Sequence, residues 1–177
     1  AASQGLSDPK DVMASVFIQL PLDASEMRIV LASVLESLSE SEATPDFAAR
    51  MGLERGVTGY VLHTVPVAMH AWLSAKGDFR KAIQLAILCG GDADTVAAIA
   101  GGLCGAQVGI SSIPDDMIAG LSEPIWTREA LHHLAESLAE REPSKVPKVR
   151  SYLTPLRNLV FLVAVLFHGF RRLFPPY

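Results

Sequence analysis

Apolar side chains recur at helical spacing along most of the chain. In residues 24–38 the apolar positions follow the i, i+3, i+4, i+7 pattern of a helix with one buried face: Met27, Val30, Leu31, Val34, Leu35 and Leu38. The same pattern predicts helices over residues 10–20, 64–75, 78–89, 94–109, 127–141 and 153–173. The alternation that marks a half-buried strand is nearly absent. The pattern therefore predicts an all-α domain, built as a bundle of packed helices.

Local signals mark several of the helix boundaries. A proline follows Asp8, so we expect Asp8 to cap the first helix with the proline in its first turn. Asp23 and Glu26 resemble a capping box before the second helix. Residues 39–45 are mostly polar and predict a loop, whereas Pro66 is compatible with the first turn of its helix.

The chain divides by composition into a body, a linker and a tail. Residues 1–141 form the helical body, residues 142–152 are a Pro/Lys linker, and residues 153–177 hold a hydrophobic helix and tail. The apolar run from Leu159 to Phe167 is too short to cross a bilayer, which takes about 20 apolar residues. We expect this helix to pack on the core or on a neighbouring subunit. Contact with a membrane surface is the less favoured alternative.

Composition limits the class of function. The chain has 177 residues, of which 50% are apolar and 19% are charged, and this balance excludes an intrinsically disordered chain. The formal net charge of −4 gives no general electrostatic basis for nucleic-acid binding. Two cysteines do not make a disulfide framework, so we expect a reducing, cytoplasmic setting.

The segment from Gly90 to Thr95 concentrates the polar chemistry of the chain. Two glycines permit a tight turn, after which Asp92, Asp94 and Thr95 bring two carboxylates and a hydroxyl within four residues. One of the acids would serve as a helix cap. The second acid adds repulsion unless a cation neutralises the pair, and Mg²⁺ takes such oxygen ligands. The spacing alone leaves both interpretations open, a helix cap and a magnesium site.

Other residues that could carry chemistry have simpler interpretations. His63 and His70 are seven residues apart and share a helix face, but we expect packing or capping roles for them. Cys89 and Cys104 lie in apolar surroundings, where cysteine acts as a small hydrophobic residue. The small residues Gly101, Gly105 and Gly109 at i, i+4 and i+8 predict a close approach by another segment.

These segments together resemble a known family. GGDADT at residues 90–95, followed by the helix VAAIAGGLCGAQVG, resembles the metal motif of the ADP-ribosylglycohydrolase family, usually written GGDTDT. Residues 59–64 (GYVLHT) are similar to the GYV-x-x-T helix start of its bacterial members, and the helix DFRKAIQLAI also fits. The closing residues 157–177 resemble the tail of one bacterial subgroup. The resemblance covers most of residues 5–177, and Ala93 replaces the usual Thr of the motif.

The resemblance implies a fold, a reaction and a set of site residues. The family is all-α, holds two Mg²⁺ ions, and hydrolyses the glycosidic bond of ADP-ribose on a modified protein or other acceptor. Carried over, Asp92, Asp94 and Thr95 are metal ligands, and Gly59, Tyr60 and Gly91 lie at the substrate pocket. The resemblance assigns no catalytic residue in this chain, and the sequence does not name the acceptor, which is an ADP-ribosylated protein or a small molecule that contains ADP-ribose.

One expected motif is absent from the sequence. The family's first acidic metal motif, a Thr/Ser-Asp-Asp-Thr cluster, is not found, and Asp115 and Asp116 lack the neighbouring hydroxyl residues and predict only the solvated first turn of a short helix. We therefore expect a partial domain with an incomplete metal site, which self-associates or binds a complementing N-terminal segment. The alternative is a non-catalytic helical interaction module derived from the same fold.

Overall fold

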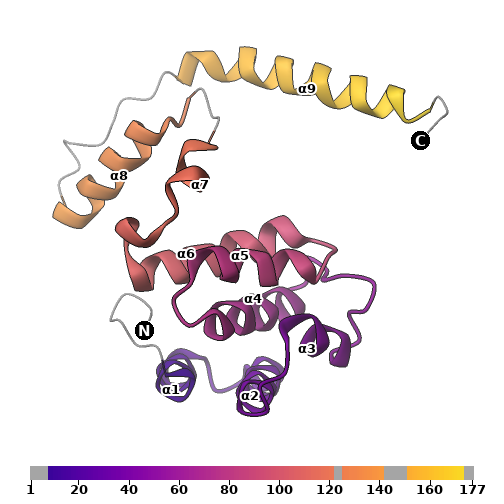
Figure 1. The fold of residues 1–177 in the computed structure, drawn as a ribbon, viewed down its shortest axis with the longest axis vertical. Helices are drawn as coiled ribbons and strands as arrows, with labels where there is room; N and C mark the ends of the chain where they lie inside the picture. The colour runs from indigo at the N-terminus through magenta and orange to yellow at the C-terminus, as the bar shows by residue number, and fades with distance from the viewer. Residues whose placement is uncertain (1–7, 122–124, 142–150, 174–177) are drawn as a thin grey trace. The chain divides into compact units, whose positions relative to one another are not determined.

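Helices account for the regular structure of the protein. The computed structural model describes residues 8–121, 125–141 and 151–173, and no strand occurs in these ranges, which confirms the all-α prediction (Figure 1). The elements follow in the order α1 (Pro9–Gln19), α2 (Ser25–Ser39), α3 (Thr44–Arg50), α4 (Val61–Ala75), α5 (Phe79–Leu88), α6 (Ala93–Val108), η2 (Ile110–Ser112), α7 (Asp115–Ala119), α8 (Arg128–Glu140), η4 (Ser151–Leu153) and α9 (Thr154–Arg171).

The chain separates into two units, residues 1–115 and residues 116–177. The predicted linker, residues 142–152, falls within the second unit, and all but its last two residues lie outside the described ranges, as do residues 174–177 of the predicted tail. The predicted division into body, linker and tail therefore stays a prediction. None of the described helices is both long and apolar enough to cross a membrane.

Helix α4 lies at the centre of the first unit. Helices α2, α3, α5 and α6 all pack against it (Figure 1). Its residues Val67 and Trp72 are buried, and the Trp72 indole Nε1 donates a hydrogen bond to Gln107 Oε1 of α6 at 2.9 Å. Because α4 is covered on several sides, most of its residues after Val65 are buried, and it carries apolar residues around most of its circumference.

Three helix starts differ from the sequence prediction. Helix α3 begins at Thr44, inside the stretch predicted as a loop, because its Phe47 is fully buried and this packing outweighs the polar composition. The capping box of Asp23 and Glu26 does not form, since α2 begins at Ser25 without a side-chain cap. Helix α4 begins earlier than predicted, and Pro66 therefore lies inside the helix instead of in its first turn.

The small residues of α6 have two different roles. A Cβ at Gly101 would lie 2.7 Å from Ile83 Cδ1, and one at Gly105 would lie 3.6 Å from Phe79 Cε2, so both glycines let α5 pack closely. This confirms the predicted close approach at two of the three positions. Gly109 instead ends the helix with a φ of 76°, a left-handed conformation that suits glycine.

Candidate metal centre

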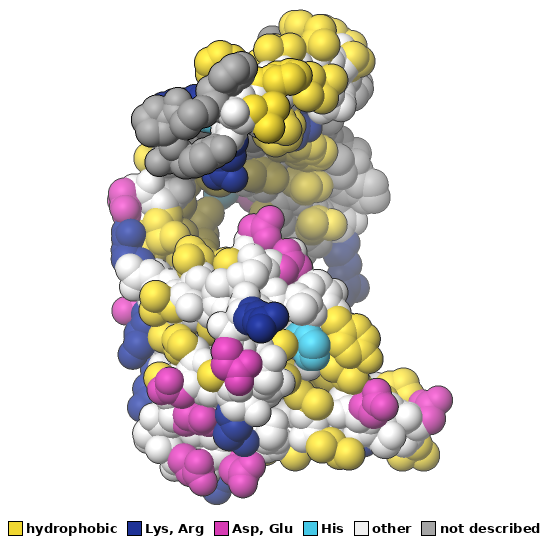
Figure 2. Space-filling model, turned by 90° about the vertical axis from the view of Figure 1, so that its right-hand side faces the viewer, with side chains coloured by type: hydrophobic (Ala, Val, Ile, Leu, Met, Phe, Trp, Pro, Cys, Tyr) yellow, Lys and Arg dark blue, Asp and Glu magenta, His cyan; other side chains and the backbone are white. Residues whose placement is uncertain are grey.

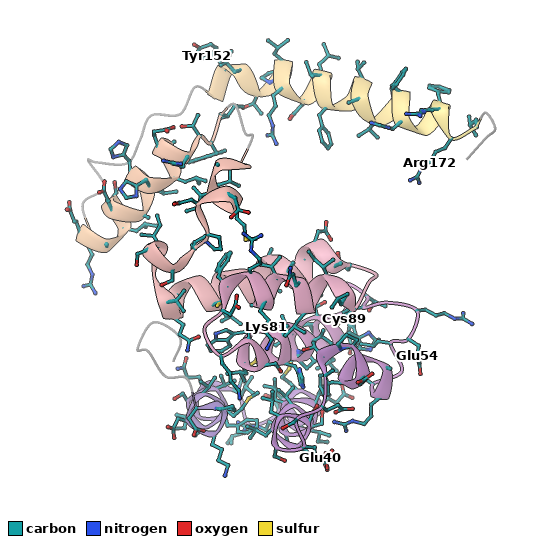
Figure 3. All side chains as sticks on the ribbon, in the orientation of Figure 1. Glu40, Glu54, Lys81, Cys89, Tyr152 and Arg172 are labelled. Carbon is teal, nitrogen blue, oxygen red and sulfur yellow. The ribbon has the colours of Figure 1, made fainter. Side chains whose placement is uncertain are left out.

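The acidic segment lies at a tight corner between two helices. Helix α5 ends at Leu88, Cys89 follows it (labelled in Figure 3), and α6 begins at Ala93. Gly90 and Gly91 make the turn with φ values of 67° and 68°, which residues with a Cβ rarely adopt. The two glycines therefore turn the chain so that the acids arrive at the N-terminal end of α6.

A short parallel bridge fixes this corner to a second segment. The Val57 N–H donates to Gly90 O at 3.2 Å, and the Asp92 N–H donates to Val57 O at 2.7 Å. The approach is so close that a Cβ at Gly91 would overlap the backbone of Val57. The sequence predicts Gly91 at the substrate pocket. The structure shows that the bridge itself also requires a glycine at this position. The bridge therefore sets the start of residues 59–64 beside residues 90–95, the two segments that resemble the family motifs.

The side chain of Asp92 does not cap the helix it precedes. Asp92 occupies the N-cap position of α6, yet its carboxylate accepts no backbone N–H of that helix. Its Oδ1 instead accepts a hydrogen bond from Thr95 Oγ1 at 2.8 Å, while Asp94 Oδ1 accepts from the Thr95 N–H at 2.9 Å. The capping role left open by the sequence is therefore not formed by Asp92, and the three predicted ligands are linked to one another.

The corner presents hard oxygen donors to solvent. Asp94 is exposed, and its pKa lies below the usual value because the Thr95 backbone N–H donates to its carboxylate, with a further contribution from the Asp92 side chain. Ionised carboxylates and a hydroxyl match the ligand chemistry of Mg²⁺. Among the residues that the structure describes, no cluster of three or more His, Cys, Asp and Glu is placed to hold a metal ion. The donors thus match Mg²⁺ in chemical kind, while their role as metal ligands stays a prediction.

Gly59 and Tyr60 lie beside this corner. A Cβ at Gly59 would lie 3.2 Å from Asp92 Oδ2, so the backbone passes close to the acid. Tyr60 is the N-cap residue of α4, its side chain is half exposed, and its ring meets His63 edge-on with 5.2 Å between centroids. The structure therefore gathers Gly59, Tyr60 and the acids in one place, while their roles toward substrate stay predictions.

Sequence reasoning missed Thr58, which organises the start of α4. Its Oγ1 accepts from the Tyr60 N–H at 3.3 Å and is hydrogen-bonded to His63 Nδ1 at 2.8 Å. The Thr64 hydroxyl donates back to Thr58 O at 2.9 Å. Thr58 precedes the first residue of this apolar helix by three positions, and a threonine there is a sequence signal for such a local turn.

Comparison with known proteins decides the family. The profile of the ADP-ribosylglycohydrolase family matches residues 1–147. The chain belongs to this family. It is 38% identical over 87 residues to the ADP-ribosylarginine hydrolase Tri1 of Pseudomonas putida (strain GB-1), which covers 49% of this chain and 22% of that protein. The Tri1 hydrolase of Serratia proteamaculans (strain 568) is 38% identical over 88 residues, covering 50% and 23%.

Two further facts bear on these comparisons. An uncharacterised protein of Archaeoglobus fulgidus is 39% identical over 79 residues, which cover 45% of this chain and 24% of the relative. The chain therefore spans less than a quarter of the length of each of these three relatives. No solved structure matches the chain.

The remaining candidates are packing residues, as the sequence predicted. His70 is fully buried and hydrogen-bonded to Ser37 and Thr44, whereas His63 is partly buried and hydrogen-bonded to Thr58. The two histidines share none of these partners. Burial lowers the pKa of His70 to about 4 and raises the pKa of the Cys89 thiol to about 11. Both groups are neutral at pH 7, and a buried neutral thiol is a poor nucleophile.

Asp115 and Asp116 also follow the sequence prediction. They form the first turn of α7, a five-residue helix, and both are exposed. Acidic side chains in this position are stabilised by the positive end of the helix dipole. The structure therefore agrees with a solvated first turn at this pair of acids.

Proposed function

We propose that this chain takes part in hydrolysing the glycosidic bond of ADP-ribose on a modified acceptor, with Asp92, Asp94 and Thr95 as magnesium ligands. Membership of the ADP-ribosylglycohydrolase family supports the reaction. The observation that carries the proposal is the bridge between Val57 and Gly91, which sets the acids beside Gly59 and Tyr60.

Each residue of the corner has a physical task in this proposal. Asp92 and Asp94 supply carboxylate oxygen donors, and the Thr95 hydroxyl orients the carboxylate of Asp92. Gly59 keeps the space next to Asp92 Oδ2 free of side-chain atoms, so a sugar hydroxyl can approach. Bound Mg²⁺ would supply positive charge that orients ribose hydroxyls and water and offsets charge on the departing acceptor.

Tyr60 is suited to contact the organic part of the substrate. Its ring is 53% exposed and is held edge-on by His63, which in turn is hydrogen-bonded to Thr58. A half-exposed aromatic ring with a fixed orientation offers a surface against which a ribose or base can pack. We therefore place Tyr60 at the substrate, beside the metal and not among its ligands.

The substrate class follows from the family and its named relatives. We propose ADP-ribosylated proteins, or small molecules that contain ADP-ribose, as substrates. Two of the relatives are named ADP-ribosylarginine hydrolases, so an arginine-linked ADP-ribose is the first acceptor to test.

The metal site needs ligands beyond this corner. The family resemblance implies two Mg²⁺ ions, each with six coordination positions, and the three side chains of this corner are too few to hold both ions. We propose that a complementing segment or a second copy of the chain supplies the rest. Light scattering during a Mg²⁺ titration tests the second copy, because a particle mass that stays at the 19.0 kDa of one chain would exclude it.

Calorimetric titration with Mg²⁺ tests the metal ligands directly. We expect Asp94→Ala and Asp92→Asn to weaken Mg²⁺ binding at least about tenfold, since each removes a charged oxygen donor. Asp115→Asn is the matched control, because it removes an exposed acid at the start of another helix. Equal binding by the wild type and all three variants would contradict the proposed ligands.

Hydrolysis is measured separately from metal binding. The readout is Mg²⁺-dependent release of ADP-ribose from ADP-ribosylarginine by the full chain, with and without a supplied N-terminal segment of a family member. We expect release that is lost in Asp94→Ala and kept in Asp115→Asn. Binding of ADP-ribose without release under both conditions would favour the alternative, a non-catalytic interaction module.

A further inference from the structure

Helix α9 carries an apolar surface that its own unit leaves exposed. Leu159, Val163, Leu166 and Phe170 lie at i, i+4, i+7 and i+11 and so share one face, and each is 49–60% exposed. Figure 2 draws the apolar side chains in yellow, and Figure 3 labels Tyr152, which lies in η4 just before the helix, and Arg172, which follows its last residue. No residue of α9 is buried.

The apolar surface of α9 is wider than a helix–helix seam. Phe161 and Val165 lie on the opposite side of the helix from the face just described, and they are 68% and 51% exposed. A helix that packs in one groove needs only a narrow apolar stripe, whereas the broader apolar face of α9 suits partial burial at the surface of a bilayer. The family profile ends at residue 147, before α9, so this surface is not part of the matched family domain.

Charge is distributed unevenly along the chain. No Asp or Glu follows Glu142, while the segment after it contains six basic residues: Lys145, Lys148, Arg150, Arg157, Arg171 and Arg172. Residues 1–142 hold the other nine Lys and Arg against all 19 Asp and Glu, a formal net charge of −10. The apolar helix is therefore set in a basic segment that follows a strongly acidic one.

We propose that α9 is an interfacial helix that docks this protein on an anionic lipid bilayer. An amphipathic helix with apolar residues on its broad face and cations at its ends lies in the headgroup region, with its axis along the surface. Arg171 and Arg172 follow the apolar run, where their charged ends reach lipid headgroups while their stems stay apolar. The cations draw the segment to anionic lipid, which by itself repels the acidic residues 1–142.

The location of the cations also sets the lipid preference. Lipid tails alone would attract the apolar face on any bilayer, but one apolar helix of 18 residues gives only part of the affinity. The six basic residues add attraction that exists only on a negatively charged surface and that salt screens. The proposal therefore requires binding that depends on both the apolar face and the lipid charge. It does not depend on the proposed hydrolase function.

Vesicle flotation of the full chain tests the proposal. We expect the wild type to float with vesicles of phosphatidylcholine mixed with phosphatidylserine, and much less with phosphatidylcholine alone. Val163→Glu/Leu166→Glu places two charges on the apolar face, and we expect about a tenfold or larger loss of binding. The matched control is Ile18→Glu/Leu22→Glu, which adds the same two charges at exposed apolar positions in the first unit and leaves binding nearly unchanged.

A second pair of variants separates charge from apolar contact. Each cation near an anionic surface strengthens binding about fivefold, so Arg171→Gln/Arg172→Gln should bind about 25-fold more weakly to the anionic vesicles. Lys10→Gln/Arg55→Gln removes the same charge from the first unit and serves as the control. Circular dichroism of each variant checks that helix content is unchanged.

Two results would overturn the proposal. One is a wild-type chain that floats with neither kind of vesicle. This holds also if light scattering shows that the chain self-associates through α9. The other is flotation that the α9 variants and their controls reduce equally. Either result would assign the apolar face to a second copy or to the rest of the chain instead of lipid.

Discussion

Two polar clusters of the first unit are built in opposite ways. His70 is fully buried, and both of its ring nitrogens are hydrogen-bonded, Nε2 to Ser37 at 2.9 Å and Nδ1 to Thr44 at 3.0 Å. At the corner, Asp94 is exposed and Asp92 is partly exposed, and each carboxylate accepts a hydrogen bond from Thr95. The first cluster has its hydrogen bonds satisfied inside the protein, whereas the second leaves oxygen atoms available to a ligand.

The difference follows from the surroundings of each group. A buried polar group without a partner costs about 1–3 kcal/mol, so the core must supply a partner for each nitrogen of His70. The Ser37 hydroxyl donates to Glu42 and therefore accepts from Nε2–H, which leaves Nδ1 as the acceptor for the Thr44 hydroxyl. Exposed acids meet no such requirement, because water solvates them. We infer that the buried cluster serves stability and the exposed corner serves binding.

The largest effect is expected where the backbone holds the exposed corner together. Gly91→Ala places a Cβ against the backbone of Val57 at a φ of 68°, so we expect a loss of about 3 kcal/mol or more in the free energy of unfolding. Gly102→Ala is the control, since its Cβ has no neighbour within 4 Å and should stabilise α6 by about 0.5–1 kcal/mol. Urea unfolding measures both. Equal stability of the two variants would show that the bridge is not needed.

The next effect concerns pH and the buried cluster. The pKa of His70 in the folded protein is about 4, lowered from 6.5 by burial, so between these values the unfolded chain binds a proton that the folded chain does not. Stability is therefore intact above pH 6.5 and is lost as the pH falls toward 4, by about 3 kcal/mol in total. Urea midpoints at pH 7 and pH 4.5 check this. A His70→Gln variant should lose less stability between pH 7 and pH 4.5 than the wild type. Equal losses in the two proteins would show that His70 does not cause the pH dependence.

A smaller loss is expected from one hydrogen-bond partner of His70. Ser37→Ala removes the acceptor of the His70 Nε2–H, and we expect the free energy of unfolding to fall by about 1–2 kcal/mol. Ser39→Ala is the matched control on the same helix, because Ser39 is exposed and bonds only to Glu36 O. The control should stay within about 0.5 kcal/mol of the wild type. Thermal unfolding of both variants distinguishes burial from simple loss of a hydroxyl.

The sequence was sufficient for features that depend on local pattern. The extents of α1, α2, α5, α6 and α9 agree with the periodicity to within a few residues, and Asp8 caps α1 as predicted. Helix α3 escaped prediction because its formation depends on burying Phe47 against the His70 ring, a contact between distant segments. No local pattern reports such a contact.

The candidate site shows the same division between local and distant information. The proximity of Asp92, Asp94 and Thr95 could be predicted from the sequence because they lie within four residues of one another. Their position beside Gly59 depends on the hydrogen bonds of Val57 to Gly90 and Asp92, which join segments far apart in the chain. A single bridge has no periodicity, so only the structure reveals it.

The smallest effect on stability, and the sharpest test of the comparison, is expected at Thr95. Thr95→Val removes the hydroxyl that holds Asp92 Oδ1 and frees that carboxylate to accept helix N–H groups, so the free energy of unfolding should change by less than about 0.5 kcal/mol. Mg²⁺ binding should weaken about tenfold, because a donor is lost and Asp92 is no longer oriented. Thr95→Ser keeps the hydroxyl and should restore binding. A stability loss as large as that of Ser37→Ala, with Mg²⁺ binding unchanged, would place this corner with the buried cluster as a structural element.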